Sequence, residues 1–460
     1  MSPRAFAERI CRKLRAAGYQ AFLVGGCVRD ILLGHEPADY DVCTAATPEQ
    51  VLRIFPRSLT VGAKFGVVIV VEDSQADTLP AGAGAASDPV APVQVEVATF
   101  RSDIGYSDGR HPDSVVLAKS PEQDVKRRDF TINALLMNPE TNEVLDFVGG
   151  REDLRAGIIR AIGDPVERFR EDKLRMVRAV RFASRLHYEI EPKTFRAIQE
   201  LAPEIGQVSP ERLRDELTKL LTEGAARRAF ELLDETKLLP QLLPEIARMK
   251  GVEQPPQFHP EGDVWIHTLL MLEKLPTGCS STLAWGVLLH DVGKPATFTP
   301  ASGPDGRIRF DRHAEVGTRM AEEICRRLRF SNDDTEQIAA LVASHMKFKD
   351  VLQMKPATLK RFARLNRFDE HLELHRLDCS SSHRMLDNYD FVRRFMDETP
   401  AEEIRPPRLL TGDDLLAIGL KPGPAFKEIL NAVEEAQLND SISTREEALI
   451  LAKSLISSQN

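Results

Sequence analysis

The feature that most constrains the fold is a change of hydrophobic pattern near residue 151. Residues 21–150 contain short runs rich in β-branched and aromatic residues, namely AFLVGG, YDVCTA, FGVVIVV, VQVEVATF and VLDFVGG. Runs of this length, bounded by glycines or acidic turns, predict β-strands. Beyond residue 151 the strand signals vanish, and apolar residues recur at helical spacing to the end of the chain. A strand-containing first part followed by a long helical part predicts the α+β class.

Breaks rich in proline and glycine divide the helical part, at 251–263, 299–306, 398–407 and 420–424. A chain of 460 residues is also too long for one ordinary core. We therefore expect domains at 1–150, 151–250, 251–400 and 401–460. Within the first domain we expect helices at the N-terminus, at 47–55 and at 121–137. The low-complexity stretch 77–89 is expected to be a surface insertion between two strands.

Composition excludes several classes of protein. Apolar residues make up 42% of the chain and charged residues 28%, as in a globular protein. The six cysteines show no C-x-x-C spacing and are expected to be reduced thiols. No export segment or membrane-spanning run is apparent, so we expect a cytoplasmic protein with no obligatory protein partner. The net charge of −9 argues against general coating of nucleic acid, although residues 160–185 carry eight basic and four acidic residues. This local excess of positive charge is compatible with a substrate groove and equally with a solvent-exposed charged helix.

A candidate site for phosphate transfer begins in FLVGGCVRDILLGHEPADYDV, residues 22–42. An expected strand runs into Gly25 and Gly26, and a helix that carries Arg29 follows. Glycines at such a junction allow a triphosphate to approach backbone amides at a helix N-terminus. Asp39 and Asp41 alternate along an expected strand, so both carboxylates project from one face. Two carboxylates beside a triphosphate suit two-metal nucleotidyl transfer, whereas D-x-D in isolation is more often a surface strand end.

Four blocks in order resemble the class II tRNA nucleotidyltransferases and bacterial poly(A) polymerases of the polymerase-β superfamily. The blocks are GGCVRDILLG with DYD, RRDFTINA (127–134), DFVGG (146–150) and EDKLRMVRAVRF (171–182). The resemblance implies a polymerase-β-like head, then an all-α neck, a body and a helical tail. It implies Mg²⁺ at Asp39 and Asp41, triphosphate contact by Arg128 and ribose contact by Asp129. The implied substrates are tRNA, CTP and ATP.

The fourth block also has a direct chemical reading. Asp172 and Arg175 are three apart on an expected helix and are therefore neighbours on one face. A carboxylate accepts from an exocyclic amine and a guanidinium donates in a fork, so the pair can hydrogen-bond the Watson–Crick edge of C or A. The resemblance implies that the pair serves as a protein template. Arg178 and Arg181 continue the same expected face, and we expect them to orient the pair or bind phosphate. By spacing alone, a surface salt bridge is the alternative.

Two local features bear on which nucleotides are added. Poly(A) polymerases of this class carry a G-R-R-F-like block where this chain reads VGAKFGVVIVV, which is nearer the CCA-adding pattern. The stretch 99–115 resembles the flexible loop that full CCA-adding enzymes need for the terminal A. Arg110 and Asp113 are its candidate members, and His111 stands where arginine is commoner. We therefore expect addition of the whole CCA end, with a poly(A) polymerase or a CC- or A-adding enzyme as alternatives.

A second constellation lies in the helical half. Histidines and aspartates follow in the order H…HD…H…H…D, as His267, His290, Asp291, His313, His345 and Asp378. These groups bind divalent metals, and a buried His-Asp pair is costly unless it binds something. The pattern, with HDVGK as its most specific fragment, resembles the HD phosphohydrolase superfamily. The resemblance implies an HD domain in which Mg²⁺, Mn²⁺, Ni²⁺ or Co²⁺ supports hydrolysis of a phosphate ester, with Lys294 either binding phosphate or lying on the surface.

Three rival interpretations remain open from the sequence. The HD region is a helical scaffold that holds tRNA, or the whole chain is an HD phosphodiesterase whose head only recruits substrate. A noncatalytic tRNA-binding protein is the third and requires both metal sites to be silent. An inactive head is disfavoured because the chain retains the polar residues that the transferase reaction needs, namely Asp39, Asp41, Arg128, Asp172 and Arg175.

Overall fold

The structure is a computed structural model that describes residues 1–60, 66–72, 92–104, 114–118, 120–257, 259–301 and 306–459. The chain forms two compact units. The first unit comprises Met1–Leu220 and Arg228–Pro244, and the second comprises Leu221–Arg227 and Glu245–Asn460. The predicted α+β class is confirmed, because the first unit contains a β-sheet and the second is mainly helical. The predicted borders near residues 150 and 400 fall inside these units and stay predictions.

The first unit is built on a seven-stranded sheet in the order β3-β4-β5-β2-β1-β8-β9. Its strands are β1 (Ala21–Val24), β2 (Asp41–Thr44), β3 (Ser58–Leu59), β4 (Val67–Val71), β5 (Gln94–Thr99), β8 (Leu136–Met137) and β9 (Val144–Leu145). The central strand β2 pairs antiparallel with β1 and parallel with β5. This register sets Asp41 opposite Glu96, so two acidic residues of different strands meet at the sheet.

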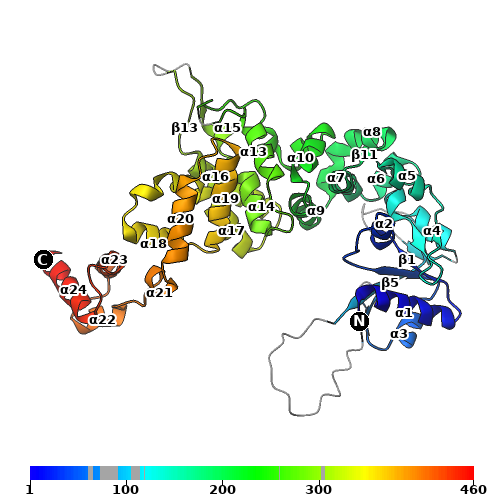
Figure 1. Cartoon of the computed structure of the whole chain (residues 1–460), viewed down its shortest axis with the longest axis horizontal. Helices are drawn as coiled ribbons and strands as arrows, with labels where there is room; N and C mark the ends of the chain where they lie inside the picture. The colour runs from blue at the N-terminus through cyan, green and yellow to red at the C-terminus, as the bar shows by residue number, and fades with distance from the viewer. Residues whose placement is uncertain are drawn as a thin grey trace, which may run out of the picture. The chain divides into compact units, whose positions relative to one another are not determined.

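Helices α1 (Pro3–Ala16) and α3 (Pro48–Ile54) lie together on one side of this sheet (Figure 1). Ser2 caps α1 by accepting a hydrogen bond from the Ala5 amide, which satisfies one of the free donors at the helix start. Phe6, Ile10 and Leu14 recur at helical spacing on α1, and all three are buried. Their burial anchors the helix to the sheet that carries the site.

Two parts of the sequence reading need correction. The expected helix at 121–137 is α-helical only over α4 (Pro121–Lys126), after which a 3-10 turn, η2 (Thr131–Asn133), leads into β8. The interruption has a local cause, because the Asp129 side chain accepts a hydrogen bond from the Phe130 amide and Phe130 is extended. Strands also persist beyond residue 151, as β10 (Ile158–Ile159) with β11 (Glu189–Ile190) and as β12 (Phe298–Thr299) with β13 (Arg309–Phe310).

The remaining helices of residues 150–247 are short to medium in length. They are α5 (Gly150–Ala156), α6 (Pro165–Glu171), α7 (Leu174–Leu186), α8 (Pro192–Leu201), η3 (Ala202–Gln207), α9 (Pro210–Thr222), α10 (Ala226–Glu235), α11 (Leu239–Leu242) and α12 (Pro244–Ala247). A separate ribbon of β6 (Arg101–Ile104) and β7 (Ser114–Leu117) precedes α4.

The second unit packs its helices around α14. Its elements are α13 (Val264–Glu273), α14 (Ser281–Leu289), α15 (Lys294–Thr297), α16 (His313–Arg327), α17 (Asn332–Ser344), η4 (His345–Gln353), α18 (Pro356–Ala363), α19 (Phe368–Ser381), α20 (Asp387–Glu398), α21 (Ala401–Ile404), α22 (Gly412–Ala417), α23 (Pro424–Leu438) and α24 (Arg445–Gln459). All eight residues of α14 from Thr282 to Leu289 are buried, so this helix forms the centre of the unit. Close packing continues beyond α14, since a Cβ on Gly293 would stand 2.2 Å from the carbonyl oxygen of His313. Glycine there lets the turn after α14 reach the start of α16.

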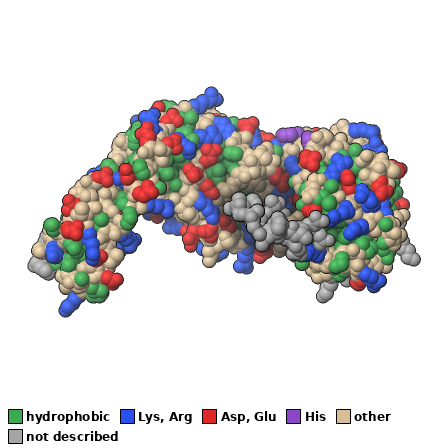
Figure 2. Space-filling view, turned by 60° about the horizontal axis from the view of Figure 1, so that its bottom comes forward, with side chains coloured by type: hydrophobic (Ala, Val, Ile, Leu, Met, Phe, Trp, Pro, Cys, Tyr) green, Lys and Arg blue, Asp and Glu red, His purple; other side chains and the backbone are tan. Residues whose placement is uncertain are grey.

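On the face seen in Figure 2, lysine and arginine side chains are interspersed with aspartate and glutamate. Among the helices that the structure describes, none combines the length and the apolar character needed to cross a membrane.

Candidate functional site

A pocket of about 400 Å³ in the first unit gathers most of the predicted nucleotide-binding residues. It is lined by Gly25, Gly26, Arg29, Asp41, Arg128, Asp129, Asn133, Asp172, Arg175, Arg178 and Phe182. These residues come from three separate stretches of sequence, and the sheet and α7 bring them to one hollow. Of the predicted transferase residues that the structure describes, Asp39 and Arg181 are missing from the lining.

The acidic side of this pocket centres on Asp41, the first residue of β2. Asp39 is exposed and lies in the loop before the strand, so the prediction that both aspartates sit on a strand is wrong for Asp39. The pKa of Asp41 is raised to about 6, chiefly by burial and then by the negative charge of Glu96, with Asp39 adding to the effect and Arg128 opposing it. Sequence reasoning missed Glu96, although an acidic residue within the alternating strand VQVEVATF was its signal. Asp41 and Glu96 face each other on paired strands, and carboxylate oxygens are the ligands that Mg²⁺ prefers.

The basic side begins at the glycine turn. Gly25 has a φ of 81° and stands immediately before α2 (Gly26–Leu32), a conformation that favours glycine. Arg29 on α2 is 3% exposed and donates to Asn133 at 2.7 Å and to Asp30 at 2.8 Å. Because both neighbours hold the guanidinium, Arg29 is fixed at the pocket wall.

Two further arginines pair with carboxylates around the pocket. Arg128 donates from Nη2 to Asp124 at 3.0 Å, and Arg178 donates from Nη2 to Asp129 at 2.6 Å. Burial favours a high pKa for Asp129, but the Arg178 guanidinium outweighs it and holds that pKa below its usual range. Asp129 is therefore an ionised acceptor at the pocket.

Asp172 and Arg175 line the same pocket but do not share a helix face. Helix α6 ends at Glu171 and α7 begins at Leu174, so Asp172 lies between them with an extended backbone and accepts from the Leu174 amide at 3.1 Å. The prediction of a helical i,i+3 pair is wrong because the extended backbone of Asp172 interrupts the helix. Arg175 instead donates to Glu171 at 2.6 Å.

Helix α9 supplies two residues that sequence reasoning missed. Arg212 donates to both carboxylate oxygens of Asp172, and Glu216 accepts from Arg181 at 2.6 Å. Arg181 is only 6% exposed and lies against the Phe182 ring, 4.5 Å from its centroid. The structure thus gives Arg181 a place behind the pocket wall, where it supports α7. The only sequence signal for Arg212 and Glu216 is the amphipathic spacing of SPERLRDELTKLL in α9. Because many amphipathic helices share this spacing, it does not identify them as partners of the site.

The candidate loop residues Arg110 and Asp113 lie outside the described residues, as does the stretch 77–89. The ends of the loop are described, and Ile104 pairs directly with Ser114 across the β6–β7 ribbon.

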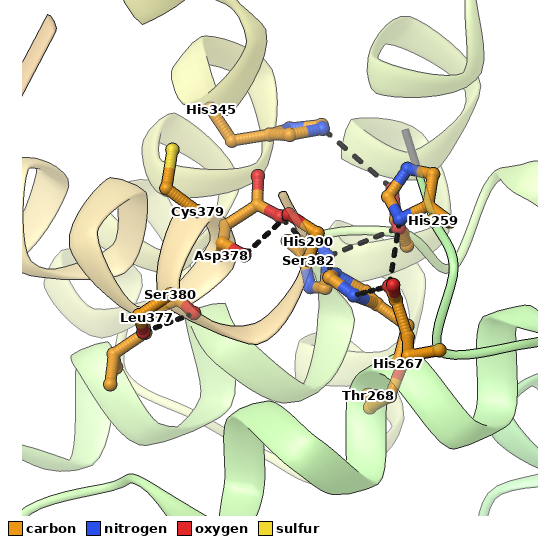
Figure 3. A network of polar contacts seen from close by, with 12 residues as sticks. His259, His267, Thr268, His290, His345, Leu377, Asp378, Cys379, Ser380 and Ser382 are labelled. Atoms are coloured by element: carbon orange, nitrogen blue, oxygen red, sulfur yellow. Dashed lines mark hydrogen bonds and ion pairs between the residues drawn. The ribbon is translucent and has the colours of Figure 1, made fainter. Parts of the chain in front are cut away.

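In the second unit the six predicted metal ligands lie together in two adjoining groups. His267, His290 and Asp378 form one group, and Asp291, His313 and His345 form the other, each with ligand atoms within 4.8 Å of one another. Asp291 joins the groups, since its Oδ2 lies 3.1 Å from Nε2 of His290 and its Oδ1 lies 3.6 Å from Nε2 of His313. His290 and Asp291 lie just after the end of α14 rather than within a helix, because the turn of residues 290–293 starts there. Figure 3 shows His267, His290, His345 and Asp378 converging from different segments.

The ring orientations of the histidines indicate what the site can hold. Nδ1 of His313 donates to the Phe310 carbonyl at 2.9 Å, and Nδ1 of His345 donates to the Val342 carbonyl at 2.6 Å. Burial lowers the pKa of His313 and lowers that of His345 to about 4, so both rings are neutral near pH 7. Their Nε2 atoms then carry lone pairs and yet face each other at 3.2 Å. Two lone pairs at this distance repel unless a cation lies beside them, so the donor set fits a divalent metal.

The first group differs in the charge of one ring. Burial disfavours the charged form of His267, but its hydrogen bonds to Asp378 and Glu261 outweigh burial and raise its pKa to about 9. Its buried Nε2 lies 3.2 Å from Oδ1 of Asp378, and the buried Nε2 of His290 lies 3.1 Å from Oδ2 of Asp291. A cation bound at this group would displace the Nε2 proton of His267.

Lys294 is buried and donates to Asp291 at 2.7 Å, so the surface alternative for this lysine is wrong. Lys294 also donates to Gln254 at 2.6 Å, a residue that sequence reasoning missed.

His259 and Glu261 adjoin the same cluster and were also missed. Both lie in QFHPEGD, which the sequence reading took only as a break between domains. Oε1 of Glu261 accepts from His259 at 2.9 Å and from His267 at 2.7 Å. Their signal was the close spacing of His, Glu and His in 259–267.

Three family models match the chain. The "Poly A polymerase head domain" matches residues 21–160, and the "Probable RNA and SrmB- binding site of polymerase A" matches residues 187–250. The "tRNA nucleotidyltransferase domain 2 putative" matches residues 313–452.

Several curated relatives and solved structures are described as CCA-adding enzymes. A CCA-adding enzyme of Streptococcus mutans is 30% identical over 453 residues, which are 97% of this chain and 96% of that protein. A CCA-adding enzyme of Geobacillus stearothermophilus is 44% identical over 229 residues, and that match spans 50% of this chain and 52% of the relative. The crystal structure of the Bacillus stearothermophilus CCA-adding enzyme in complex with CTP covers 100% of this chain and 99% of its own, with a TM-score of 0.73 and 28% identity. The Thermotoga maritima CCA-adding enzyme complexed with tRNA shares the fold, covering 100% of this chain and 97% of its own at a TM-score of 0.55 and 18% identity.

Proposed function

The chain belongs to the family of CCA-adding enzymes, and from this premise we propose that it adds C, C and A to the 3′ end of tRNA from CTP and ATP. One observation carries the proposal. A single pocket contains the carboxylate of Asp41, the glycine turn at Gly25 and the polar pair Asp172 and Arg175. These are the parts needed to hold metal, triphosphate and base at once.

Each group of the pocket has a separate task in this reaction. Bound Mg²⁺ would be held by Asp39 and Asp41, with Glu96 beside them, and would neutralise charge on the transferred phosphoryl group. Arg128 and the amides after Gly25 face the triphosphate, while Asp129 accepts from the ribose. The guanidinium of Arg175 and the carboxylate of Asp172 offer donors and acceptors to the base edge. Selection of C and A then rests on the loss of these hydrogen bonds when a wrong base enters.

Incorporation of labelled CTP and ATP tests this function. The substrates are tRNA transcripts that end at the discriminator base, at C or at CC, and the expected products all end in CCA. Transcripts that stop at CC, that accept only the final A, or that grow a long A tail identify the CC-adding, A-adding and poly(A) alternatives. Asp41→Asn is expected to abolish addition, and Glu36→Gln, in the exposed loop before β2, is the control. Normal addition by Asp41→Asn would place the active site elsewhere.

We propose a second activity, hydrolysis of a phosphate ester, for the HD-type cluster of the second unit. The observation that favours it is the pair of facing Nε2 atoms of His313 and His345, which calls for a cation. Divalent ions held by the six ligands would supply Lewis acidity toward a phosphate ester. Lys294 neutralises Asp291, and the backbone carbonyls hold three of the histidine rings in place.

The test supplies Mn²⁺, Co²⁺ or Ni²⁺ with a 2′,3′-cyclic phosphate or a simple phosphomonoester. Asp291→Ala is expected to lose both bound metal and hydrolysis while it continues to add CCA. Asp350→Ala, at an exposed position of the same unit, is the matched control. Absence of bound metal and of hydrolysis in the wild type would leave this region as a helical scaffold. Hydrolysis without nucleotide addition in the wild type would instead support the phosphodiesterase alternative.

A further inference from the structure

Glu261 is a buried carboxylate that the reactions proposed above do not use. It lies in the segment before α13, and its side chain is 8% exposed. Its Oε1 lies 2.7 Å from Nδ1 of His267 and 2.9 Å from Nδ1 of His259. An ionised carboxylate only accepts hydrogen bonds, so both imidazoles present an Nδ1–H to the same oxygen.

The other three histidines of the cluster are held in a different way. Nδ1 of His290 donates to the Val287 carbonyl at 2.8 Å, and His313 and His345 likewise use the carbonyl three residues earlier. For His267 the corresponding carbonyl is that of Val264, which already accepts from the Thr268 hydroxyl at 2.8 Å. His267 therefore takes its Nδ1 acceptor from outside its own helix, and Glu261 provides it.

Resting on the proposed hydrolase function, we propose that Glu261 is a positioning residue for the metal site. It holds the His267 ring so that Nε2 faces Asp378 and His290, and His259 holds the Glu261 carboxylate in turn. A carboxylate behind a ligating imidazole fixes its tautomer and strengthens it as a donor, and such partners typically contribute 10- to 100-fold in metal affinity. His259 is 17% exposed, so the carboxylate is clamped between a fully buried ring and a ring at the rim of the cluster.

Titration of Mn²⁺ into the EDTA-stripped full-length chain tests the proposal, with calorimetry as the readout. In the wild type we expect two ions per chain. Glu261→Ala should weaken the ion at His267, His290 and Asp378 about 10- to 100-fold and leave the ion at the other group unchanged. Glu261→Gln should lose less, because the amide oxygen still accepts from His267. Glu253→Gln, an exposed position of the same segment, is the matched control and should bind as the wild type does.

Folding of the variants is followed separately by tryptophan fluorescence, since both tryptophans, Trp265 and Trp285, lie in the second unit. Unchanged Mn²⁺ affinity in Glu261→Ala would overturn the proposal. The proposal would also be overturned if Glu261→Gln lost Mn²⁺ affinity equally at both groups and unfolded at a lower midpoint, because that result would indicate a general structural effect. A wild type that binds Mn²⁺ but hydrolyses nothing would defeat the hydrolase function and leave the role of Glu261 standing. A wild type that binds no Mn²⁺ would defeat both.

Discussion

Both carboxylate oxygens of Asp172 accept hydrogen bonds from the guanidinium of Arg212, at 3.1 Å from Nη1 and 2.7 Å from Nη2. The two residues lie 40 positions apart, on the break between α6 and α7 and on α9. A bidentate pair fixes the plane of the carboxylate as well as its position. Asp172 is thus an oriented acceptor at the pocket, although it lies outside any regular helix.

Arg212→Ala should weaken selection of the correct nucleotide more than it weakens folding. A hydrogen bond to a charged group contributes about 1.5–3 kcal/mol, so kcat/KM for CTP should fall roughly tenfold to hundredfold and UTP misincorporation should rise. Arg214→Ala on the same helix removes an exposed pair with Asp215 and is the control. Unaltered discrimination in Arg212→Ala would show that Asp172 needs no partner.

Nucleotide addition at limiting Mg²⁺ should decline as the pH falls through about 6, because a proton then competes with the ion for Asp41, whose pKa is about 6. The midpoint should move to lower pH when Mg²⁺ is raised. In Glu96→Gln the midpoint should also move to lower pH, because the charge of Glu96 helps to raise the pKa of Asp41. The pKa of Asp41 should stay above its ordinary value in this variant, since burial is the larger cause. Initial rates across pH at two Mg²⁺ concentrations measure this. A midpoint that does not change with the Mg²⁺ concentration would contradict this prediction.

Arg181→Ala should destabilise the first unit by about 3–5 kcal/mol, because it leaves the buried Glu216 carboxylate without its charged partner. The double replacement Arg181→Met with Glu216→Leu should recover most of that loss. Urea unfolding followed by far-ultraviolet circular dichroism measures the change. Tryptophan fluorescence is the internal control, since both tryptophans report on the second unit. A circular dichroism transition identical to the wild type would refute the prediction.

Replacing residues 105–113 by Asn-Gly should give tRNA that stops at CC. A two-residue turn can close the ribbon directly, because Ile104 and Ser114 are paired. The matched control shortens residues 77–89, whose flanking strands β4 and β5 are paired up to Val71 and Gln94. Sequencing of the tRNA ends separates the outcomes, and equal loss of C and A addition would assign the loop to general binding or folding.

The sequence by itself determined the α+β class, the glycine turn, the acidic residues before and on β2, and the order of the six HD-type ligands. Each of these is a local pattern, since strand alternation, a turn or an adjacent His-Asp pair involves residues within a few positions of one another. The nucleotidyltransferase resemblance was equally local, because it rested on short ordered blocks. Local patterns also misled where a side chain competes with the backbone, as at Asp172, whose carboxylate accepts from the Leu174 amide where the expected helix is interrupted.

Only the tertiary structure decided which partners hold those groups. Glu96 meets Asp41 through parallel strand pairing, Arg212 reaches Asp172 from another helix, and Glu261 reaches His267 from a preceding segment. Such contacts depend on how elements pack, and packing brings together residues whose separation in sequence carries no fixed period. A glutamate or arginine on an amphipathic surface looks the same in the sequence whether it faces solvent or holds a carboxylate or imidazole of a site.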